Sequence, residues 1–457
     1  MSALSLAEEK MRQAGQPEEA IRNFASAFTR LAEGEKGVMP SSELEFAGEV
    51  PALDELATGG EQEALARLVV IKLNGGLATT MGLRGPKSLM EARDGVSFLD
   101  FIIGQTLALR RAHDVQLPLV LMNSDVTREA TRAKLAEHPE LDVGLPMDFE
   151  QSMIPKLEAD TLEPASWPAE PALEWCPPGH GDIYGALRRS GLLQALLDRG
   201  FRYAMISNSD NLGATVEPRI AAHLARENIE FLMEVVEGTE AERKGGHIAR
   251  RRSDGQLVLR ESAQTSDEDQ ESFRDFRRWR YYNTNNLWVN LESLSRLLEE
   301  NDGVLALPLI VNRKTVDPRD SDSTPVLQLE SAMGAAIGSF QGAALLLVPR
   351  SRFVPVKTTN DLLVMRSDVY RVTPEMLVEP LPEREGRLPY VDLDSRFYKL
   401  VDQFEQRFPD GAPSLREAER LVVHGDVTFG GGVVVRGAVE LEAGDPMRIE
   451  PGTTLTP

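Results

Sequence analysis

Residues 69–88 read VVIKLNGGLATTMGLRGPKS, an apolar run that leads directly into a glycine-rich loop. The glycines at 75, 76, 82 and 85 allow backbone N–H groups to approach a phosphate closely. Two cations, Arg84 and Lys87, stand in the same loop. We therefore expect a strand whose following loop binds a nucleotide triphosphate, with a purely structural turn as the alternative. The spacing matches neither GxxxxGK(S/T) nor GxGxxG, so the general phosphate-loop motifs do not identify it.

The chain around this stretch alternates short apolar runs with amphipathic segments. The runs are Leu68 to Leu73, Leu117 to Met122, Tyr203 to Ser207, Glu230 to Val236, Leu287 to Val289 and Ala343 to Val348. Phe101 to Arg111 and Ile183 to Arg199 have the spacing of helices. This alternation predicts an α/β domain with a largely parallel sheet. The ligand is expected beyond the carboxyl ends of the strands, where the loops begin.

Composition narrows the possible partners. The 457 residues carry a formal net charge of −22 and include one cysteine, Cys176. Such an acidic chain is not expected to bind nucleic acid, and any anionic ligand needs a local positive pocket. No apolar run is long enough to span a membrane, so no membrane partner is expected. A single cysteine cannot form an internal disulfide and the N-terminus lacks a secretion signal, which together predict a cytoplasmic protein.

Two flanking regions differ from the central part of the chain. The apolar spacing from Pro17 to Leu31 predicts a helix, and a linker rich in Gly, Pro, Ser and Glu follows it. Near the C-terminus, apolar pairs recur every six residues at Leu421/Val423, Val427/Phe429, Val433/Val435 and Val439/Leu441. This spacing fits the coils of a β-helix, with an ordinary β-meander as the alternative. Four short coils leave an open end, which would suit contact with a second copy of the chain in a homo-oligomer.

A histidine stands in a second glycine-containing loop, WCPPGHGDIY at residues 175–184. Gly179 and Gly181 leave room around His180, and Asp182 is expected to cap a helix that starts at Ile183. A histidine in this setting can hydrogen-bond a sugar hydroxyl or a phosphate oxygen. A structural loop histidine is the alternative.

An aspartate follows the third apolar run, in the sequence NSDNLG at residues 208–213. A carboxylate at the tip of a strand is a common magnesium ligand when phosphates and waters supply the remaining positions. Asp210 is therefore the candidate for Mg²⁺. An Asx-rich turn that merely closes the strand is the alternative.

Two later segments complete the set of polar clusters. YNTNNLW at residues 282–288 carries amides suited to hydroxyl recognition, with a polar edge strand as the alternative. VPRSRFVPVK at residues 348–357 brings three more cations to the end of a strand. We expect the cations of both loops to converge on one cleft, with a surface salt-bridge patch as the alternative; they are Arg84, Lys87, Arg350, Arg352 and Lys357.

Five segments together resemble the eukaryotic-type UTP–glucose-1-phosphate uridylyltransferases, also called UDP-glucose pyrophosphorylases. They are LNGGLATTMGLRGPKS, PPGHGDIYGAL, ISNSDNLGATV, YNTNNLWVNL and VPRSRFVPVKTTNDLL, in the family's order over residues 65–370 or so. The resemblance implies a Rossmann-like, GT-A-like nucleotidyltransferase core with a mixed, mainly parallel sheet. It also implies a C-terminal left-handed β-helix. The expected divisions are an N-terminal helical segment and linker at 1–60, a catalytic domain at 61–375, a linker at 376–415 and the β-helix at 416–457.

The resemblance also implies a role for each residue that matches a family motif. The UTP-binding residues would be Leu73, Asn74, Gly75, Gly76, Lys87, Gln151, Gly179, Asn208 and Lys357, with Gln151 at the uracil edge. The sugar-phosphate-binding residues would be His180, Asn208 and Asn285. Asp210 would bind Mg²⁺, and Lys87 and Lys357 would be the catalytic cations.

The implied reaction is the reversible formation of UDP-glucose and pyrophosphate from UTP and glucose 1-phosphate, by Mg²⁺-assisted direct displacement at the α-phosphorus. Both reactants are anions, so the site must screen negative charge and fix alignment. One alternative is a pyrophosphorylase of another UDP-sugar, such as UDP-galactose or UDP-N-acetylhexosamine. The other is a non-catalytic nucleotide-sugar-binding protein, against which the retention of Lys87, Asp210 and Lys357 argues.

The sequence departs from the family pattern at a few positions. Ala78 stands where the family has glycine, and Arg84 replaces a lysine. The stretches around Lys244 and at 261–269, ESAQTSDED, differ from the family pattern, the second by being more charged. Because this region is expected to shape the sugar side, these changes bear on sugar preference.

Overall fold

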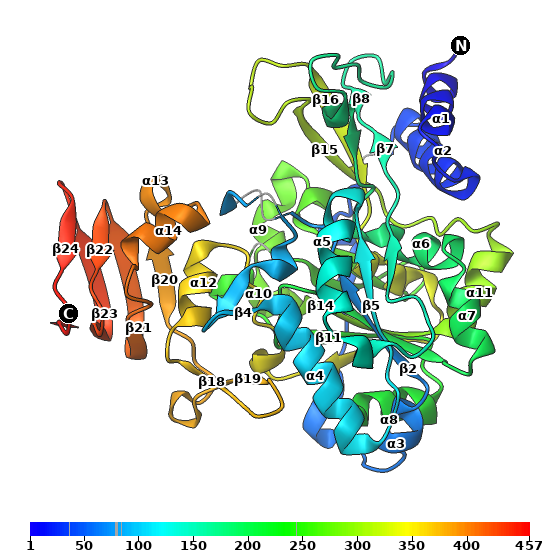
Figure 1. The fold of residues 1–457 in the computed structure, drawn as a ribbon. Helices are drawn as coiled ribbons and strands as arrows, with labels where there is room; N and C mark the ends of the chain where they lie inside the picture. Colours follow the sequence, from blue (N-terminus) through cyan, green and yellow to red (C-terminus); the bar gives the residue numbers. More distant parts are fainter. Residues whose placement is uncertain (36, 78–80, 84, 244) are drawn as a thin grey trace.

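The protein is described here from a computed structural model that covers residues 1–35, 37–77, 81–83, 85–243 and 245–457. Ala78, Arg84 and Lys244, which figured in the sequence predictions, lie outside the described residues. The chain is built around a large mixed sheet with helices on both faces, and the C-terminal strands lie to one side of it (Figure 1).

The central sheet has ten strands. They are β1 (Leu44–Phe46), β2 (Leu68–Leu73), β5 (Leu119–Asn123), β6 (Asp148–Glu150), β10 (Tyr203–Asn208), β11 (Phe231–Glu237), β12 (His247–Arg251), β13 (Leu257–Arg260), β14 (Tyr281–Asn290) and β17 (Ala343–Leu347). Seven of them follow the order β1-β12-β14-β10-β2-β5-β6, with β11, β13 and β17 paired outside this path. All six apolar runs in the sequence are confirmed as strands, with boundaries that differ by a few residues.

Strands β10, β2, β5 and β6 are parallel neighbours, and β14 adds antiparallel pairs, so the sheet is mixed. In the parallel part Leu73 is the register partner of both Asn208 and Met122. The carboxyl ends of β2, β5 and β10 therefore meet at one edge, which is where a ligand site of an α/β sheet is expected.

Strand β2 divides two hydrophobic cores. Its side chains are buried along almost its whole length, as is usual for a parallel strand covered on both faces. Leu68 and Val70 join one core, and Val69 and Ile71 join the other. The polar exception is Lys72, which is only 3% exposed.

The helices cover both faces of the sheet and form the N-terminal lead. They are α1 (Ala3–Gln13), α2 (Glu18–Ala32), α3 (Glu61–Leu65), α4 (Phe98–His113), α5 (Asp125–Ala136), α6 (Ile183–Arg189), α7 (Leu192–Asp198), α8 (Pro218–Glu227), α9 (Gln270–Phe273), α10 (Phe276–Trp279), α11 (Leu291–Glu300), α12 (Thr359–Arg366), α13 (Ser395–Tyr398) and α14 (Val401–Arg407). The helix expected between Pro17 and Leu31 is confirmed as α2. The helix-like stretch from Ile183 to Arg199 is confirmed as two helices, because Gly191 adopts φ +74° and separates α6 from α7.

The two N-terminal helices pack on a small sheet that projects from the core (Figure 1). That sheet consists of β15 (Ile310–Thr315), β16 (Pro325–Glu330) and β8 (Leu157–Glu158). Phe24 and Phe28 of α2 share a hydrophobic cluster with Leu309, just before β15, and with Leu329 of β16. Nearby, β7 (Ile154–Pro155) pairs with β9 (Trp175–Cys176). A further short hairpin, β3 (Glu91–Arg93) and β4 (Val96–Ser97), precedes α4.

The C-terminal strands form two small parallel sheets. One contains β20 (Tyr390–Leu393), β21 (Ser414–His424), β23 (Val434–Glu442) and β25 (Thr454–Leu455), and the other contains β22 (Val427–Phe429) and β24 (Met447–Ile449). Partner residues in β21 and β23, such as Leu421 and Val439, are separated by three of the six-residue repeats seen in the sequence. The left-handed β-helix itself stays a prediction.

The segment expected as a linker, 376–415, contains ordered elements. Near its start, β19 (Val378–Pro380) pairs with β18 (Tyr370–Val372), which precedes the segment. Further along, β20 joins the C-terminal sheet, and Tyr398 and Phe404 of the helices α13 and α14 are buried. The segment also reaches the glycine-rich loop, because a Cβ built on Gly82 would lie 3.1 Å from Leu400 Cδ2. Among the described residues, no helix is long and apolar enough to cross a membrane.

Candidate active site

Two lysines from distant parts of the chain meet at one carboxylate. Lys87 Nζ lies 2.8 Å from Asp210 Oδ2, and Lys357 Nζ lies 3.1 Å from the same oxygen. Asp210 follows β10, Lys87 ends the glycine-rich loop after β2, and Lys357 follows β17 and a short 3-10 turn. Three of the predicted site residues are therefore in direct contact at the carboxyl edge of the sheet.

The two lysine charges stabilise the ionised form of the Asp210 carboxylate. Burial alone would raise the pKa of Asp210, whose side chain is 9% exposed, but Lys357 and Lys87 outweigh that effect and the pKa is lowered. Lys87 is largely buried, whereas the side chain of Lys357 is 54% exposed. The site thus has one ammonium group that is largely buried, on Lys87, and one that reaches toward solvent, on Lys357.

The backbone fixes Asp210 relative to Lys357. Val356 N donates a hydrogen bond of 3.0 Å to Asp210 O, and Asn211 forms an isolated antiparallel bridge with Pro355. The loop after β10 and the segment before Lys357 therefore behave as a short two-stranded ribbon.

Gly75 and Gln151 are also brought together, as expected for the nucleotide base. A Cβ on Gly75 would lie 2.7 Å from Gln151 Nε2, so the two residues are in contact. Ser124 Oγ, at the start of α5, donates a 3.0 Å hydrogen bond to Gly75 O and so supports the loop. Ser124 could not be identified from the sequence, since its role depends on the pairing of β2 with β5.

The side chain of Asn74 does not enter this site. Its Nδ2 donates to Asn123 Oδ1 at 2.7 Å and to Thr131 Oγ1 at 2.8 Å, in the buried space beneath α5. Leu73, by contrast, ends β2 beside Asn208 of β10, and Asn208 is partly exposed with no side-chain hydrogen bond to described residues. Gly76 lies nearby, and its carbonyl accepts from Lys87 N at 3.3 Å. Only the main chain of Asn74 is therefore placed to face a nucleotide.

His180 is held in a single orientation and tautomer. Its Nδ1 accepts a hydrogen bond of 2.9 Å from Met333 N, which leaves Nε2 to carry the proton. Burial, followed by the charge of Lys357, lowers the pKa of His180 to about 4. The imidazole is therefore neutral near pH 7 and presents Nε2–H as a donor.

Gly179 must be glycine for this loop to close. Its φ is +81°, and a Cβ there would lie 2.5 Å from Ser331 O. The carbonyl of Ser331 accepts from Gly181 N at 2.9 Å, and Ser331 N donates to Pro178 O at 3.0 Å. Ser331 and Met333, which follow β16, were not anticipated from the sequence because only the fold brings them to the histidine loop.

Asn285 occupies an irregular position within a strand. It has φ +57°, opposite a register shift between Met233 and Val235 where β11 pairs with β14. Its Oδ1 accepts from Asn283 Nδ2 at 2.9 Å. The amide segment is thus part of a strand, and the bulge gives Asn285 an orientation that regular alternation would not.

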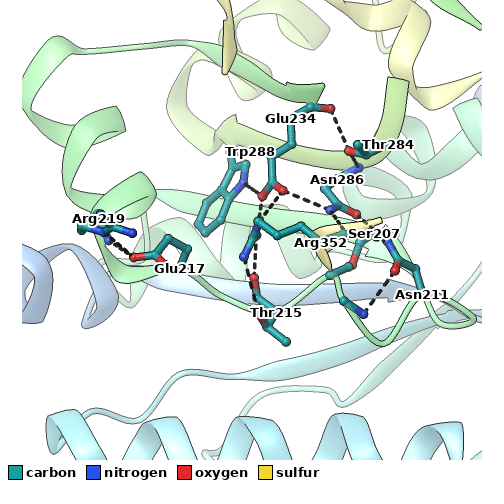
Figure 2. Close-up of polar contacts among 12 residues, drawn as sticks. Ser207, Asn211, Thr215, Glu217, Arg219, Glu234, Thr284, Asn286, Trp288 and Arg352 are labelled. Carbon is teal, nitrogen blue, oxygen red and sulfur yellow. Dashed lines mark hydrogen bonds and ion pairs between the residues drawn. The ribbon is translucent and has the colours of Figure 1, made fainter. Parts of the chain in front are cut away.

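Two of the cations expected in the cleft form ion pairs with carboxylates other than that of Asp210. Arg350 forms an ion pair of 2.5 Å with Glu242. Arg352 is buried and forms a bidentate pair with Glu234, at 2.7 Å and 2.6 Å (Figure 2). The expectation that all five cations converge was therefore wrong for Arg352, which is buried against Glu234, whereas Arg350 lines the same surface pocket as Lys357. Arg84 lies outside the described residues.

The expected capping role of Asp182 was also wrong. Its own backbone is already helical and its side chain makes no cap hydrogen bond. The carboxylate instead pairs with Arg189 at 2.8 Å and accepts from Ser152 N at 2.7 Å. It ties the histidine loop to the segment that follows Gln151.

The side chains around Asp210 fit a metal ion that takes most of its coordinating oxygens from bound phosphates and waters. Within the described ranges, no group of three or more His, Cys, Asp or Glu side chains is placed to hold a metal. Oδ2 of Asp210 accepts from both lysines, whereas the nearest described ammonium group to Oδ1 is Lys357 Nζ at 3.4 Å. One carboxylate oxygen is thus less engaged, and a metal there would need phosphate oxygens and waters for its other positions.

A mixed α/β sheet with a glycine-rich loop, paired lysines and a carboxylate at its carboxyl edge defines a nucleotide-binding transferase of the nucleotidyltransferase class. A family model described as UTP–glucose-1-phosphate uridylyltransferase matches residues 21–436. The chain belongs to the UTP–glucose-1-phosphate uridylyltransferase family. It is accordingly an enzyme that forms UDP-glucose from UTP and glucose 1-phosphate, and its family is one of nucleotidyltransferases that generally use a divalent metal.

Individual relatives agree with this assignment. The UTP–glucose-1-phosphate uridylyltransferase of Saccharomyces cerevisiae is 41% identical over 387 residues, which cover 84% of this chain and 76% of the yeast protein. A crystal structure of a variant UDP-glucose pyrophosphorylase from Leishmania major in complex with UDP-glucose is 43% identical, with a TM-score of 0.94 over 100% of this chain and 98% of the other. The UDP-glucose phosphorylase from Trypanosoma brucei is 42% identical, with a TM-score of 0.92 and coverage of 99% and 98%.

Proposed function

We propose that the chain carries out this reaction by direct displacement at the α-phosphorus of UTP, without a covalent enzyme intermediate. The observation that carries the proposal is the contact of Lys87 and Lys357 with Asp210. Two ammonium groups at one point can screen the repulsion between two phosphate-bearing reactants and stabilise the charge on departing pyrophosphate. Cys176, the one thiol, is 4% exposed and has no place in the mechanism.

The nucleotide would lie along the loop that follows β2. Gly75 and Gly76 would border the base and ribose. Gln151, whose amide packs against Gly75, would read the uracil edge, because an amide can both donate and accept. Lys87 and Lys357 would contact the phosphates. The proposed UTP-binding set is Leu73, Asn74 through its main chain, Gly75, Gly76, Lys87, Gln151, Gly179, Asn208 and Lys357.

Glucose 1-phosphate would bind between the histidine loop and β14. The neutral His180 donates from Nε2, and it stays uncharged throughout the working pH range because its pKa is lowered to about 4. Asn208 and Asn285 supply amides that can donate to phosphate or to a sugar hydroxyl. These three side chains form the proposed sugar-phosphate subsite.

Asp210 would hold Mg²⁺ once a triphosphate is bound. The ion would supply positive charge to the phosphate oxygens, and Mg²⁺ is normally bound by one or two carboxylates together with substrate phosphates. Asp210 would then exchange part of its contact with the lysines for the metal and leave the ammonium groups to the substrates.

Pyrophosphate release tests the reaction and its sugar preference. The purified protein is supplied with Mg²⁺, UTP and, separately, glucose 1-phosphate, galactose 1-phosphate or N-acetylglucosamine 1-phosphate. We expect the fastest release with glucose 1-phosphate. Faster release with another sugar would assign the chain to that UDP-sugar, and no release with any of them would leave only a binding role.

Isotope exchange tests direct displacement. Without a covalent uridylyl intermediate, labelled pyrophosphate enters UTP only when the sugar nucleotide or sugar phosphate is also present. Exchange between pyrophosphate and UTP alone would contradict the proposal.

The same preparation passed over a calibrated gel-filtration column tests whether the C-terminal strands join copies of the chain, for which a homo-oligomer is the expected result.

A further inference from the structure

A buried polar network contacts the loop that carries Asp210, and Figure 2 shows its side chains. At its centre Glu234 of β11 is fully buried, and its two carboxylate oxygens accept from Arg352 Nε at 2.7 Å and Nη2 at 2.6 Å. Trp288 Nε1 donates to one of these oxygens at 2.9 Å, and Asn286 Nδ2 donates to the other at 3.1 Å. The carboxylate is therefore fully satisfied, and its geometry is fixed by four donor groups from three residues.

Arg352 also holds the loop that carries Asp210. Its Nη2 donates to Thr215 O at 2.8 Å, just after that loop. Its own carbonyl accepts from Asn211 Nδ2 at 3.1 Å and from Asn286 Nδ2 at 3.2 Å. A single residue thus binds the loop at two places and binds β14 at a third.

Asn211 joins the same loop to the segment that leads to Lys357. Its Oδ1 accepts from Val354 N at 3.0 Å, next to the bridge between Asn211 and Pro355. Gly213 allows the close approach, since a Cβ there would lie 2.3 Å from Ser351 O. Asp210 and Lys357 therefore reach their places through bonds that converge on Arg352.

Lys72 secures the two ends of the loop from the other side. Its Nζ donates to Ser207 Oγ at 2.7 Å, before the loop, and to Ala214 O at 2.7 Å, at its end. Burial, with Arg352 nearby, lowers the pKa of Lys72 to about 7, although Glu234 acts in the opposite direction. Lys72, Arg352 and Glu234 form one interior group of charges.

Stability alone is a weak reason for such a group. The cost of removing two charges from water often cancels their attraction, so a buried ion pair contributes little net stability compared with apolar packing. What it does supply is direction, because a guanidinium–carboxylate pair is bidentate and planar.

We propose that Glu234 and Arg352 are positioning residues for the transfer reaction, which set Asp210 and Lys357 at their working separation without touching the substrates. The inference rests on the proposed role of Lys357. Alignment errors of about 1 Å can cost about a hundredfold in rate, so a small relaxation of this pair is expected to appear in turnover.

Arg352→Lys tests the proposal, since it keeps the charge and removes the bidentate geometry. We expect kcat to fall by about tenfold or more, and KM for UTP to change by less than about threefold, because the lost feature is alignment. The matched control is Arg407→Lys, at a partly buried pair with Asp426 of 2.8 Å in the C-terminal part of the chain, which should leave kcat unchanged. A kcat for Arg352→Lys equal to that of the control would overturn the proposal.

A double-mutant cycle separates positioning from general destabilisation. Lys357→Ala is measured in the unmodified protein, in Arg352→Lys and in Arg407→Lys. If Arg352 acts by placing Lys357, the loss caused by Lys357→Ala shrinks by about tenfold in Arg352→Lys and is unchanged in Arg407→Lys. Fully additive losses in both backgrounds would overturn the positioning role while leaving the role of Lys357 intact. An unchanged rate in Lys357→Ala alone would overturn both.

A second variant covers the case in which Arg352→Lys does not fold. Asn211→Ala removes the link from the carbonyl of Arg352 to Val354 N and leaves no buried charge without a partner. It should show the same fall in kcat and the same non-additivity with Lys357→Ala. Additivity in this variant would count against the proposal as it does for Arg352.

Discussion

The side-chain amide of Gln151 lies against the Cα of Gly75, so closely that a methyl group on Gly75 would stand 2.7 Å from Nε2. The contact joins the first turn of the glycine-rich loop to a residue that follows β6. It makes the absence of a side chain at Gly75 a requirement of the proposed uracil site.

Gly75→Ala is therefore expected to displace the Gln151 amide. The loss of about one hydrogen bond to the base should raise KM for UTP by about tenfold and weaken discrimination against CTP. Initial rates with both nucleotides provide the measurement. Gly85→Ala is the control in the same loop, because a Cβ there would meet none of the described residues within 4 Å. Equal effects of the two substitutions would separate Gly75 from base recognition.

Lys357→Ala is expected to lower kcat on the order of a hundredfold, with a smaller effect on the Kd for UTP, because the lost charge acts on the departing pyrophosphate. Steady-state kinetics and equilibrium binding of UTP give the two quantities. Lys314→Ala removes an exposed lysine of β15 and should change neither. A loss confined to UTP affinity would make Lys357 a binding residue only.

Two histidines with lowered pKa values predict how stability depends on pH. Their pKa values are lowered from 6.5, to about 4 for His180 and to about 3 for His247, in both cases first by burial. Above pH 6.5 folded and unfolded chains both hold neutral imidazole, and the stabilisation is fully present. As the pH falls below 6.5 the unfolded chain takes up protons that the folded chain refuses, so stability decreases toward the folded pKa values.

Urea unfolding at about pH 7.5 and about pH 5 measures this difference. His180→Asn should reduce the loss of unfolding free energy between the two values, and His424→Asn, at an exposed position, should not. A loss of the same size in His180→Asn and in the unmodified protein would show that His180 takes up its proton without cost.

Cys176 is expected to be unreactive in the folded protein. Burial raises the pKa of its thiol to about 12, and thiolate is the species that reacts with alkylating reagents. Iodoacetamide at about pH 8 should therefore label the chain in urea and leave the native chain unmodified. Rapid labelling of the native chain would show that the structure around Cys176 opens and exposes the thiol.

Much of the fold could be predicted because its signals are local. Each of the six apolar runs is a strand, since a strand buried on both faces reads as a continuous hydrophobic segment. The antiparallel placement of β14 between β10 and β11 could not be seen in this way, because pairing partners lie far apart in sequence. The sheet of β15, β16 and β8, and the helix α1, were not predicted either.

Site residues could be predicted where the residue type and its own loop were enough to identify them. Asp210, Lys87 and Lys357 were each identified from their loops, and the structure brings them into contact. Arg352 was misplaced because the sequence shows a cation but not its partner. Glu234 gave no signal at all, since a single carboxylate within an apolar strand shows its role only when Arg352 lies against it.

The contacts of Lys87 and Lys357 with Asp210 also bear on conformational entropy. A free lysine side chain loses up to about 2 kcal/mol of rotational freedom when it is fixed. Here both side chains are ordered by a carboxylate of the chain itself, so much of that loss is complete before a nucleotide arrives. Binding then exchanges carboxylate oxygens for phosphate oxygens as partners of the ammonium groups, and little further conformational entropy of the two lysine side chains is lost.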